Sequence, residues 1–210
     1  MNNFEDLLER YPALDECLDA INTARDAIIR VFENNGTLLV CGNGGSYCDA
    51  EHIAGELMKG FHKKRPLSGE LKKNLVDFGG ELGVRLSEGL QQPLRTISLI
   101  GMPALSTAVT NDITPEFAFA QQVMAFADDN SVFWGISTSG DACNVIAAAV
   151  TAKSLGAYTI GLTGAVGGKM NGLFDVVIKV PETETFKIQE LHLPVYHAIC
   201  LSVEEYFFED

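Results

Sequence analysis

The sequence lacks any apolar run close to the ~18 residues that a membrane-spanning helix needs. Its opening segment, MNNFEDLLERY, lacks the basic stretch and the apolar stretch of a signal peptide. The sequence has five cysteines, an odd number, at positions 17, 41, 48, 143 and 200. No two of them have C-x-x-C spacing. These absences disfavour a membrane protein, a secreted protein and a disulfide scaffold, so we expect a cytoplasmic protein with free thiols.

Basic residues are also scarce, with 15 Lys and Arg against 28 Asp and Glu, for a net charge of -13. A field of that sign repels phosphodiester backbones, which disfavours broad nucleic-acid binding but permits a small phosphorylated ligand in a neutral pocket. The 210 residues are 47% hydrophobic and 20% charged, which excludes a disordered or fibrous chain. We expect one domain over residues 1–210.

Helical and strand patterns alternate along the chain. Helical spacing of apolar residues fills most of an N-terminal region, 1–35, and predicts further helices at about 46–59, 115–127, 144–154 and 185–207. Short apolar runs predict strands at 37–41, 95–100, 131–136, 157–162 and 174–180. This alternation is typical of an α/β fold, a three-layer α/β/α sandwich with a mostly parallel sheet.

One segment interrupts the alternation. Residues 60–94 are polar and partly basic, with Pro66, Gly79, Gly80 and Pro93 among them. We interpret this stretch, and about 68–94 in particular, as a solvated surface excursion with a helix near 81–90.

The first predicted strand ends in a glycine-rich loop, Gly42-Asn43-Gly44-Gly45-Ser46. Glycines let the backbone approach a ligand closely, and the N-terminus of the following helix presents free N–H groups to an anion. The loop is not a dinucleotide fingerprint, because Tyr47 stands where a third glycine is needed. A tight turn without a ligand explains the loop about equally well.

The third predicted strand ends in Ser137-Thr138-Ser139-Gly140. A helix cap needs one hydroxyl, and this loop offers three beside the start of a helix, which favours a phosphate cradle. Ligands of open α/β sheets bind at the carboxyl ends of the strands. The two loops are therefore predicted to share one site.

His52 and Glu56 are four residues apart on the helix after the glycine loop, so they share a face. They suit a divalent metal or an acid/base pair, although spacing alone favours an ordinary surface pair. Gln189 and His197 lie in the last predicted helix, about 80° apart around its axis and about 12 Å apart along it.

Two other residues of the last helix have structural interpretations. His192 lies on the far side of Gln189 from His197 and is interpreted as structural. Pro194 is expected to kink the helix, because proline removes an N–H and crowds the preceding turn.

Together these segments resemble the sugar isomerase (SIS) domain family, and among its members the sedoheptulose-7-phosphate (phosphoheptose) isomerases. The segments that carry the resemblance are LLVCGNGGSYCDAEHIAGEL, TNDITPEFAFAQQV, GISTSGDACNVI, TIGLTGAVGGKM and IQELHLPVYH. With the N-terminal helices they cover most of the chain. The resemblance implies a flavodoxin-like SIS fold, a homotetramer with sites between subunits, and isomerisation of a small phosphorylated sugar without an organic cofactor.

The resemblance also assigns site residues. It implies a substrate loop, a substrate-contacting Asn-Asp pair and a phosphate-binding turn, formed by Asn43, Gly44, Gly45, Ser46, Asn111, Asp112, Ser137, Thr138 and Ser139. It implies that Glu56 and His197 move protons. It further implies that Gln189 contacts substrate, and that a Zn²⁺ site seen in some members would use His52, Glu56, Gln189 and His197.

The chain departs from the family pattern after Ser139-Gly140, where Asp141 and Ala142 stand in place of Asn and Ser. One expected phosphate donor is missing and a carboxylate is added. A second hypothesis stays open, because some SIS domains are non-catalytic and bind a sugar phosphate or a partner protein. Retention of Glu56 and His197 favours the enzyme. We expect Glu56 to reach a sugar held by the glycine loop.

Overall fold

The computed structural model describes residues 3–209 and contains a five-stranded parallel sheet in the order β2-β1-β3-β4-β5. All neighbouring strands run parallel. The predicted strands are confirmed to within a few residues, as β1 (Thr37–Gly42), β2 (Thr96–Ser98), β3 (Ser131–Ile136), β4 (Tyr158–Gly164) and β5 (Val176–Val180).

The strand order places a topological switch point between β1 and β3. The chain passes from β1 to β2 on one side and returns past β1 to β3 on the other. Gly42 at the end of β1 pairs in register with Ile136 at the end of β3. The glycine loop and the Ser/Thr loop therefore leave the sheet next to each other, at the edge where such folds bind ligands.

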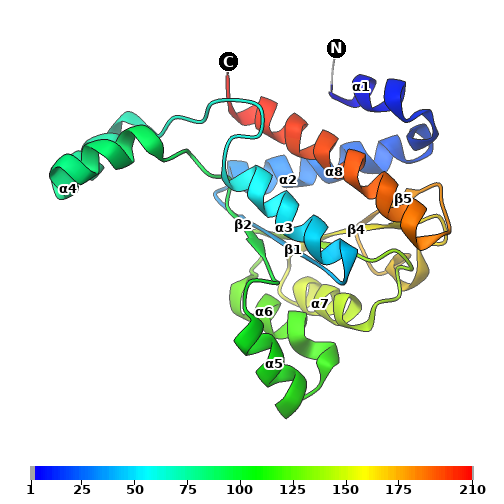
Figure 1. Cartoon of the computed structure of the whole chain (residues 1–210). Helices are drawn as coiled ribbons and strands as arrows, with labels where there is room; N and C mark the ends of the chain where they lie inside the picture. Colours follow the sequence, from blue (N-terminus) through cyan, green and yellow to red (C-terminus); the bar gives the residue numbers. More distant parts are fainter. Residues whose placement is uncertain (1–2, 210) are drawn as a thin grey trace.

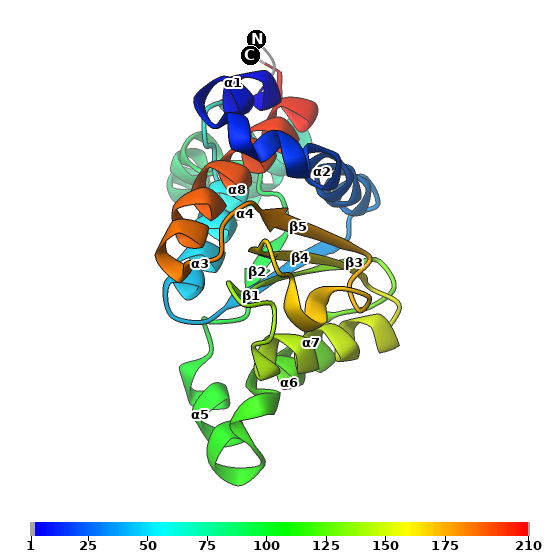
Figure 2. The ribbon, with the colours of Figure 1, turned by 90° about the vertical axis from the view of Figure 1, so that its right-hand side faces the viewer.

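Helices cover both faces of the sheet, which confirms the three-layer prediction (Figure 2). One face carries α1 (Asn3–Arg10), α2 (Leu18–Glu33), α3 (Gly45–Met58) and α8 (Thr185–Phe207). The other carries α5 (Pro103–Asp112), α6 (Ala118–Phe126) and α7 (Cys143–Ser154). In the described part of the chain, three short 3-10 helices complete these layers, at Pro12–Cys17, Pro115–Phe117 and Gly168–Met170.

The core lies between these layers, and β3 is buried along its whole length. Trp134 and Phe133 are both fully buried in it. Burial on both faces explains why β1 and β3 are continuous apolar runs in the sequence and do not alternate with polar residues.

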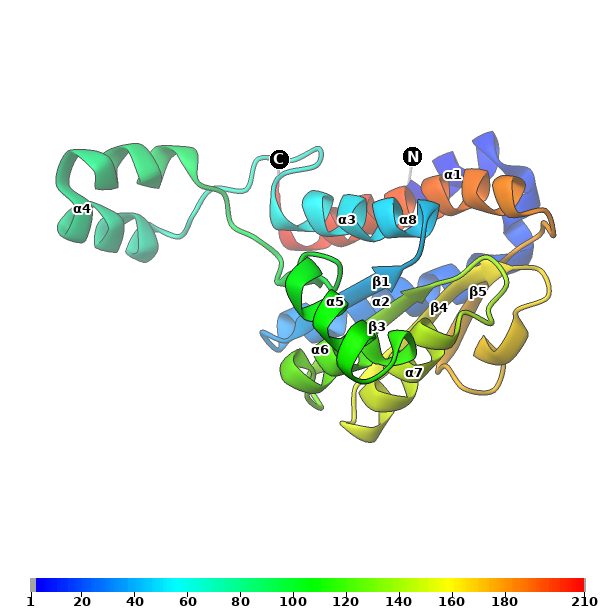
Figure 3. The same cartoon turned by 60° about the horizontal axis from the view of Figure 1, so that its bottom comes forward.

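The surface excursion at about 68–94 is helical over more of its length than the sequence predicts, because α4 (Gly69–Gly89) includes the helix expected near 81–90 and begins well before it; α4 projects from the body (Figures 1 and 3). Ser68 caps it by accepting the N–H of Leu71 at 3.3 Å. Gly80 has a φ of 52°, which kinks the helix into two antiparallel halves. A Cβ at Gly83 would overlap the carbonyl of Leu75, so glycine is required where the halves meet. The many polar side chains leave little amphipathic pattern, so the sequence does not predict this helical hairpin.

The remaining difference concerns α5, whereas α8 matches the predicted helix 185–207. The sequence pattern does not predict α5, whose small residues give little amphipathic signal. Helix α8 continues as one element through Pro194, which lies inside it and does not end it. Among the described residues, every helix is too short or too polar to traverse a lipid bilayer.

Candidate functional site

The glycine loop is shaped by close approach to α8. Gly44 has a φ of 57° and precedes the first turn of α3, a conformation that side chains rarely adopt. A Cβ on Gly45 would lie 2.5 Å from Nε2 of Gln189, so only glycine lets Gln189 reach the loop. Gln189, at the start of α8, therefore borders the glycine loop.

The Ser/Thr loop lies beside it. Ser137 is buried, Ser139 is exposed, and their hydroxyl oxygens are 3.5 Å apart. The N–H of Ser137 bonds to Leu162 and that of Gly140 bonds to Ser137, which folds the loop back over the end of β3. The loop thus leads into the N-terminus of α7, where N–H groups favour an anion.

An amide pair joins the glycine loop to the first turn of α7, the helix that follows the Ser/Thr loop. Nδ2 of Asn43 donates to Oδ1 of Asn144 at 2.8 Å, and Nδ2 of Asn144 donates back to Oδ1 of Asn43 at 2.9 Å. Oδ1 of Asn144 also accepts the N–H of Val145 in the first turn of α7. Sequence reasoning found Asn43 and missed Asn144, since an asparagine inside a predicted helix start gives no distinctive signal.

A second group of candidate residues lies between α3 and α8. His52 Nε2 is 3.2 Å from Glu56 Oε1, and the rings of His52 and His197 have centroids 4.9 Å apart. Glu56 also accepts from Nζ of Lys59 at 3.1 Å. Nε2 of His197 is buried and has no hydrogen-bond partner within residues 3–209. Burial, reinforced by His52, lowers the pKa of His197, so its ring is neutral at neutral pH. The structure therefore brings His52, Glu56 and His197 together.

Tyr196 and Asp49 border this group. The hydroxyl of Tyr196 lies 3.0 Å from Nδ1 of His52 and donates to Oδ1 of Asp49 at 3.3 Å. Burial, followed by the charge of Asp49, raises the pKa of Tyr196, so the phenol keeps its proton. Sequence reasoning missed both residues.

The loops and this group are well separated within one chain. Glu56 follows Ser46 by ten residues in α3, about 15 Å along the helix axis. Gln189 lies against Gly45 at the start of α3. His197 lies beside His52, which is further along the same helix. Glu56 therefore lies near the opposite end of α3 from the glycine loop. Within residues 3–209, no three His, Cys, Asp or Glu side chains gather as a metal site.

Other candidate residues lie around the loops. Asn111 donates to Asp112 at 2.8 Å, and both are exposed at the end of α5, on the opposite face of the sheet from α3. Asp141 accepts the N–H of Lys169 at 2.9 Å, so its carboxylate links the start of α7 to the turn after β4.

Two further residues belong to helices. Ala142 is the N-cap residue of α7 and offers no capping side chain. His192 is fully buried, and burial lowers its pKa to about 4.

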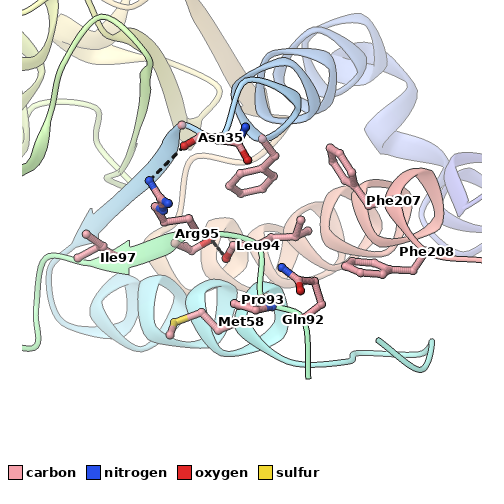
Figure 4. A pocket seen from close by; sticks show the side chains of 12 residues that line it. Asn35, Met58, Gln92, Pro93, Leu94, Arg95, Ile97, Phe207 and Phe208 are labelled. Atoms are coloured by element: carbon pink, nitrogen blue, oxygen red, sulfur yellow. Dashed lines mark hydrogen bonds between the residues drawn. The ribbon is translucent and has the colours of Figure 1, made fainter. Parts of the chain in front are cut away.

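A pocket of about 610 Å³ lies at the opposite edge of the sheet, where β1 and β2 begin (Figure 4). Apolar side chains line much of it, among them Met58, Leu94 and Phe207. Arg95 also lines the pocket and donates to the carbonyl of Asn35 at 3.1 Å. None of the predicted site residues lines it, so the candidate site is at the carboxyl edge.

Known proteins match this chain over nearly its full length. The sequence model of the SIS domain family matches residues 1–79 and 90–164, and the intervening 80–89 form the second half of α4. A phosphoheptose isomerase of Aneurinibacillus thermoaerophilus is 37% identical over 202 residues, 96% of this chain and 89% of that protein. One of Crocosphaera subtropica is 40% identical over 181 residues, 86% and 79% of the two chains. The structure of a Francisella tularensis phosphoheptose isomerase has a TM-score of 0.77 at 29% identity, covering 96% and 94% of the chains.

Proposed function

Because the chain belongs to the SIS domain family and to its phosphoheptose isomerases, we propose that it converts sedoheptulose 7-phosphate into a heptose 7-phosphate aldose. The observation that carries the proposal is the group formed by Glu56, His52 and His197, which places a carboxylate and two imidazoles together. A binding protein has no need of such a group, whereas an isomerase needs groups that move protons.

The proposed chemistry is a proton transfer between adjacent carbons. Converting a ketose to an aldose moves a proton from C1 to C2 through an enediol. Glu56 is the base that takes the proton from carbon and returns it to the neighbouring carbon. His197, whose ring is neutral, carries protons to and from the sugar oxygens.

Phosphate binding is proposed at the Ser/Thr loop. Ser137, Thr138 and Ser139 supply hydroxyls, and the N-terminus of α7 adds N–H groups. Asn43, Gly44, Gly45 and Ser46 of the neighbouring loop, with Asn111, Asp112 and Gln189, are the proposed sugar contacts. The amide pair of Asn43 and Asn144 supports this arrangement, because it fixes the spacing of the two loops.

We propose a homotetramer in which two copies build each site. Because Glu56 lies about 15 Å along α3 from its own glycine loop, the loops of one copy must meet the acid–base group of another. The α4 hairpin supports assembly, since Gly83 and Ser87 are its buried residues while Phe78 is 95% exposed. A helical hairpin without an apolar core of its own needs a partner surface.

Zn²⁺ is the metal proposed for this site, held by His52, Glu56, Gln189 and His197, the ligand set that the family resemblance implies. The buried Nε2 of His197, which has no hydrogen-bond partner among the described residues, supports this. A zinc ion, when bound, supplies polarisation of the sugar carbonyl. Metal analysis before and after chelation tests it, and full activity of metal-free protein contradicts it.

The whole chain, 1–210, is proposed as one SIS domain, with an N-terminal helical region, 1–35, and an insertion at about 68–94. The packing of α1 and α2 on α8 supports one unit. A cytoplasmic location is proposed as well, and the five free cysteines, two of them exposed, support a reducing compartment.

The test is incubation with sedoheptulose 7-phosphate and a panel of other sugar phosphates, with aldose formation followed by NMR. We expect turnover of the seven-carbon ketose and proton exchange with solvent at the carbon next to its carbonyl. The alternative, a non-catalytic sugar-phosphate or partner-binding protein, is favoured by Ala142, which removes a phosphate donor. Saturable binding of the sugar phosphate without turnover or exchange would establish that alternative.

A further inference from the structure

The turn after β4, residues 164–171, packs against the Ser/Thr loop, yet it has no role in the proposed function. A Cβ on Gly140 would lie 2.1 Å from the carbonyl oxygen of Gly167, and one on Gly168 would lie 2.5 Å from that of Ser139. Gly140 and Gly168 both have a positive φ, 71° and 50°. Only glycine fits such close contacts, so the turn and the loop are packed together as one unit.

Asp141 joins the turn to the loop through its side chain and its backbone. Its Oδ1 accepts the N–H of Lys169 at 2.9 Å, and its own N–H donates to Oγ of Ser139 at 3.2 Å. A backbone bond from the N–H of Met170 to the carbonyl of Gly140, at 3.2 Å, lies beside this contact. A serine hydroxyl accepts and donates at once, so the bond from Asp141 orients Ser139 without using the proton that a phosphate oxygen would accept.

We propose that Asp141 is a positioning residue that fastens the Ser/Thr loop to the turn after β4 and so holds the loop in the form that binds phosphate. This rests on the proposed function, which places the phosphate at the hydroxyls of that loop. A loop that is fixed before its ligand arrives loses less conformational entropy on binding, so the ligand binds more tightly.

The carboxylate of Asp141 is expected to have two effects of opposite sign. Its acceptor oxygen favours phosphate binding, because it holds the N–H of Lys169 and with it the turn. Its negative charge disfavours phosphate binding, because Asp141 lies next to Ser139 and like charges repel.

Asparagine and alanine substitutions separate these two effects. Asp141→Asn removes the charge and keeps an oxygen that can accept the N–H of Lys169, whereas Asp141→Ala removes both. The two variants carry equal charge, so the difference between them isolates the hydrogen bond. We expect inorganic phosphate to bind Asp141→Ala about five- to tenfold more weakly than Asp141→Asn, and Asp141→Asn at least as tightly as the wild type. Isothermal titration calorimetry measures all three dissociation constants.

Hydrogen exchange followed by mass spectrometry tests the hydrogen bond without any ligand. Peptides that cover residues 164–171 should exchange faster in Asp141→Ala than in Asp141→Asn, while peptides that cover β1 should not change. Asp129→Ala is the control for net charge, since it removes an exposed carboxylate just before β3, at the other end of that strand. The control should match the wild type in exchange over 164–171 and in phosphate affinity.

Steady-state kinetics with sedoheptulose 7-phosphate supply a readout that a loss of stability alone would not produce. Asp141→Ala should have a KM about five- to tenfold above that of Asp141→Asn, with kcat changed less than about twofold, because the hydrogen bond acts on phosphate binding and not on proton transfer.

The outcomes separate this proposal from the proposed function. Equal phosphate affinity in Asp141→Ala and Asp141→Asn overturns the positioning role even if the wild type turns over sugar phosphate. Equal exchange over 164–171 in the two variants overturns it as well. If phosphate binding weakens and exchange rises in Asp141→Ala while the wild type turns over no sugar phosphate, the positioning role is supported and the proposed reaction is wrong. A wild type that binds no phosphate overturns both.

Discussion

Arg65 and Glu204 form a buried ion pair that fastens the end of α3 to α8. Their side chains are 0% and 1% exposed, and Nη2 of Arg65 lies 2.8 Å from Oε1 of Glu204. Arg65 also donates to the carbonyls of Glu56 at 3.0 Å and Leu57 at 2.6 Å. The ion pair therefore positions the backbone of Glu56, the proposed catalytic base. The first two predictions concern this pair and Glu56.

Glu204→Gln is expected to destabilise the fold by roughly 3–5 kcal/mol at neutral pH, because it leaves Arg65 buried without its counter-charge. Burial raises the pKa of Glu204, but N–H groups of Phe61 and His62 and the Arg65 guanidinium outweigh it and lower the pKa overall. A lowered carboxyl pKa contributes stability above the unfolded value, and this contribution is lost as pH falls through the folded value. Urea unfolding at about pH 7 and about pH 4 measures both effects.

In the wild type, the free energy of unfolding should fall between those two pH values, and in Glu204→Gln it should fall less. Glu190→Gln is the matched control, since Glu190 is exposed on the same helix. A Glu204→Gln variant with the stability and pH dependence of this control would contradict the assigned role of the pair.

Glu56→Gln tests the proposed base. The amide keeps the size of the side chain but cannot accept the carbon-bound proton, so turnover should fall by about 10²–10⁴-fold while the fold persists. Solvent exchange of the substrate proton and circular dichroism are measured on one sample, together with its metal content. Glu51→Gln, on the exposed side of the same helix, should behave as wild type. Exchange at the wild-type rate in Glu56→Gln would exclude Glu56 as the base.

The amide pair between the two loops leads to the third prediction. Asn144→Ala should raise KM by about tenfold with a smaller change in kcat, because the loops lose their fixed spacing before substrate binds. Asn43→Ala should have a similar effect, and the double variant should cost clearly less than the sum, since both remove one interaction. Additive effects on KM would show that Asn43 and Asn144 act separately.

The sequence predicts the sheet and both loops, because β1 and β3 are buried on both faces and end in Gly and Ser/Thr. It also predicts that His52 and Glu56 share a face, which the structure confirms. It could not predict Tyr196 or Asn144, whose roles depend on which atoms of α3 and of the glycine loop they contact. Contacts of that kind arise from packing between distant segments, and no local spacing records them.

Ala142→Ser tests the phosphate cradle and has two separable effects. Serine is a favoured N-cap residue and alanine is not, so the variant should gain about 0.5–2 kcal/mol in stability without ligand. Its hydroxyl also becomes available to phosphate, so added inorganic phosphate should raise the Tm of the variant more than that of the wild type. Ser139→Ala should show the opposite, a smaller phosphate-dependent rise. Equal phosphate effects in wild type and both variants would place the cradle elsewhere.

Phe78 offers the most direct test of assembly, since it is 95% exposed at the projecting α4 hairpin in one copy. If a second copy covers this hairpin, Phe78→Asp buries a charge at the contact and should shift the protein from a tetramer to smaller species. Light scattering measures this, with Val166→Asp as control, because Val166 is an exposed apolar residue outside the hairpin. The dissociated variant should also lose bound metal and turnover, since Glu56 and the glycine loop no longer meet. A wild type that stays monomeric at every concentration, or an active monomeric Phe78→Asp variant, would rule out a site shared between copies.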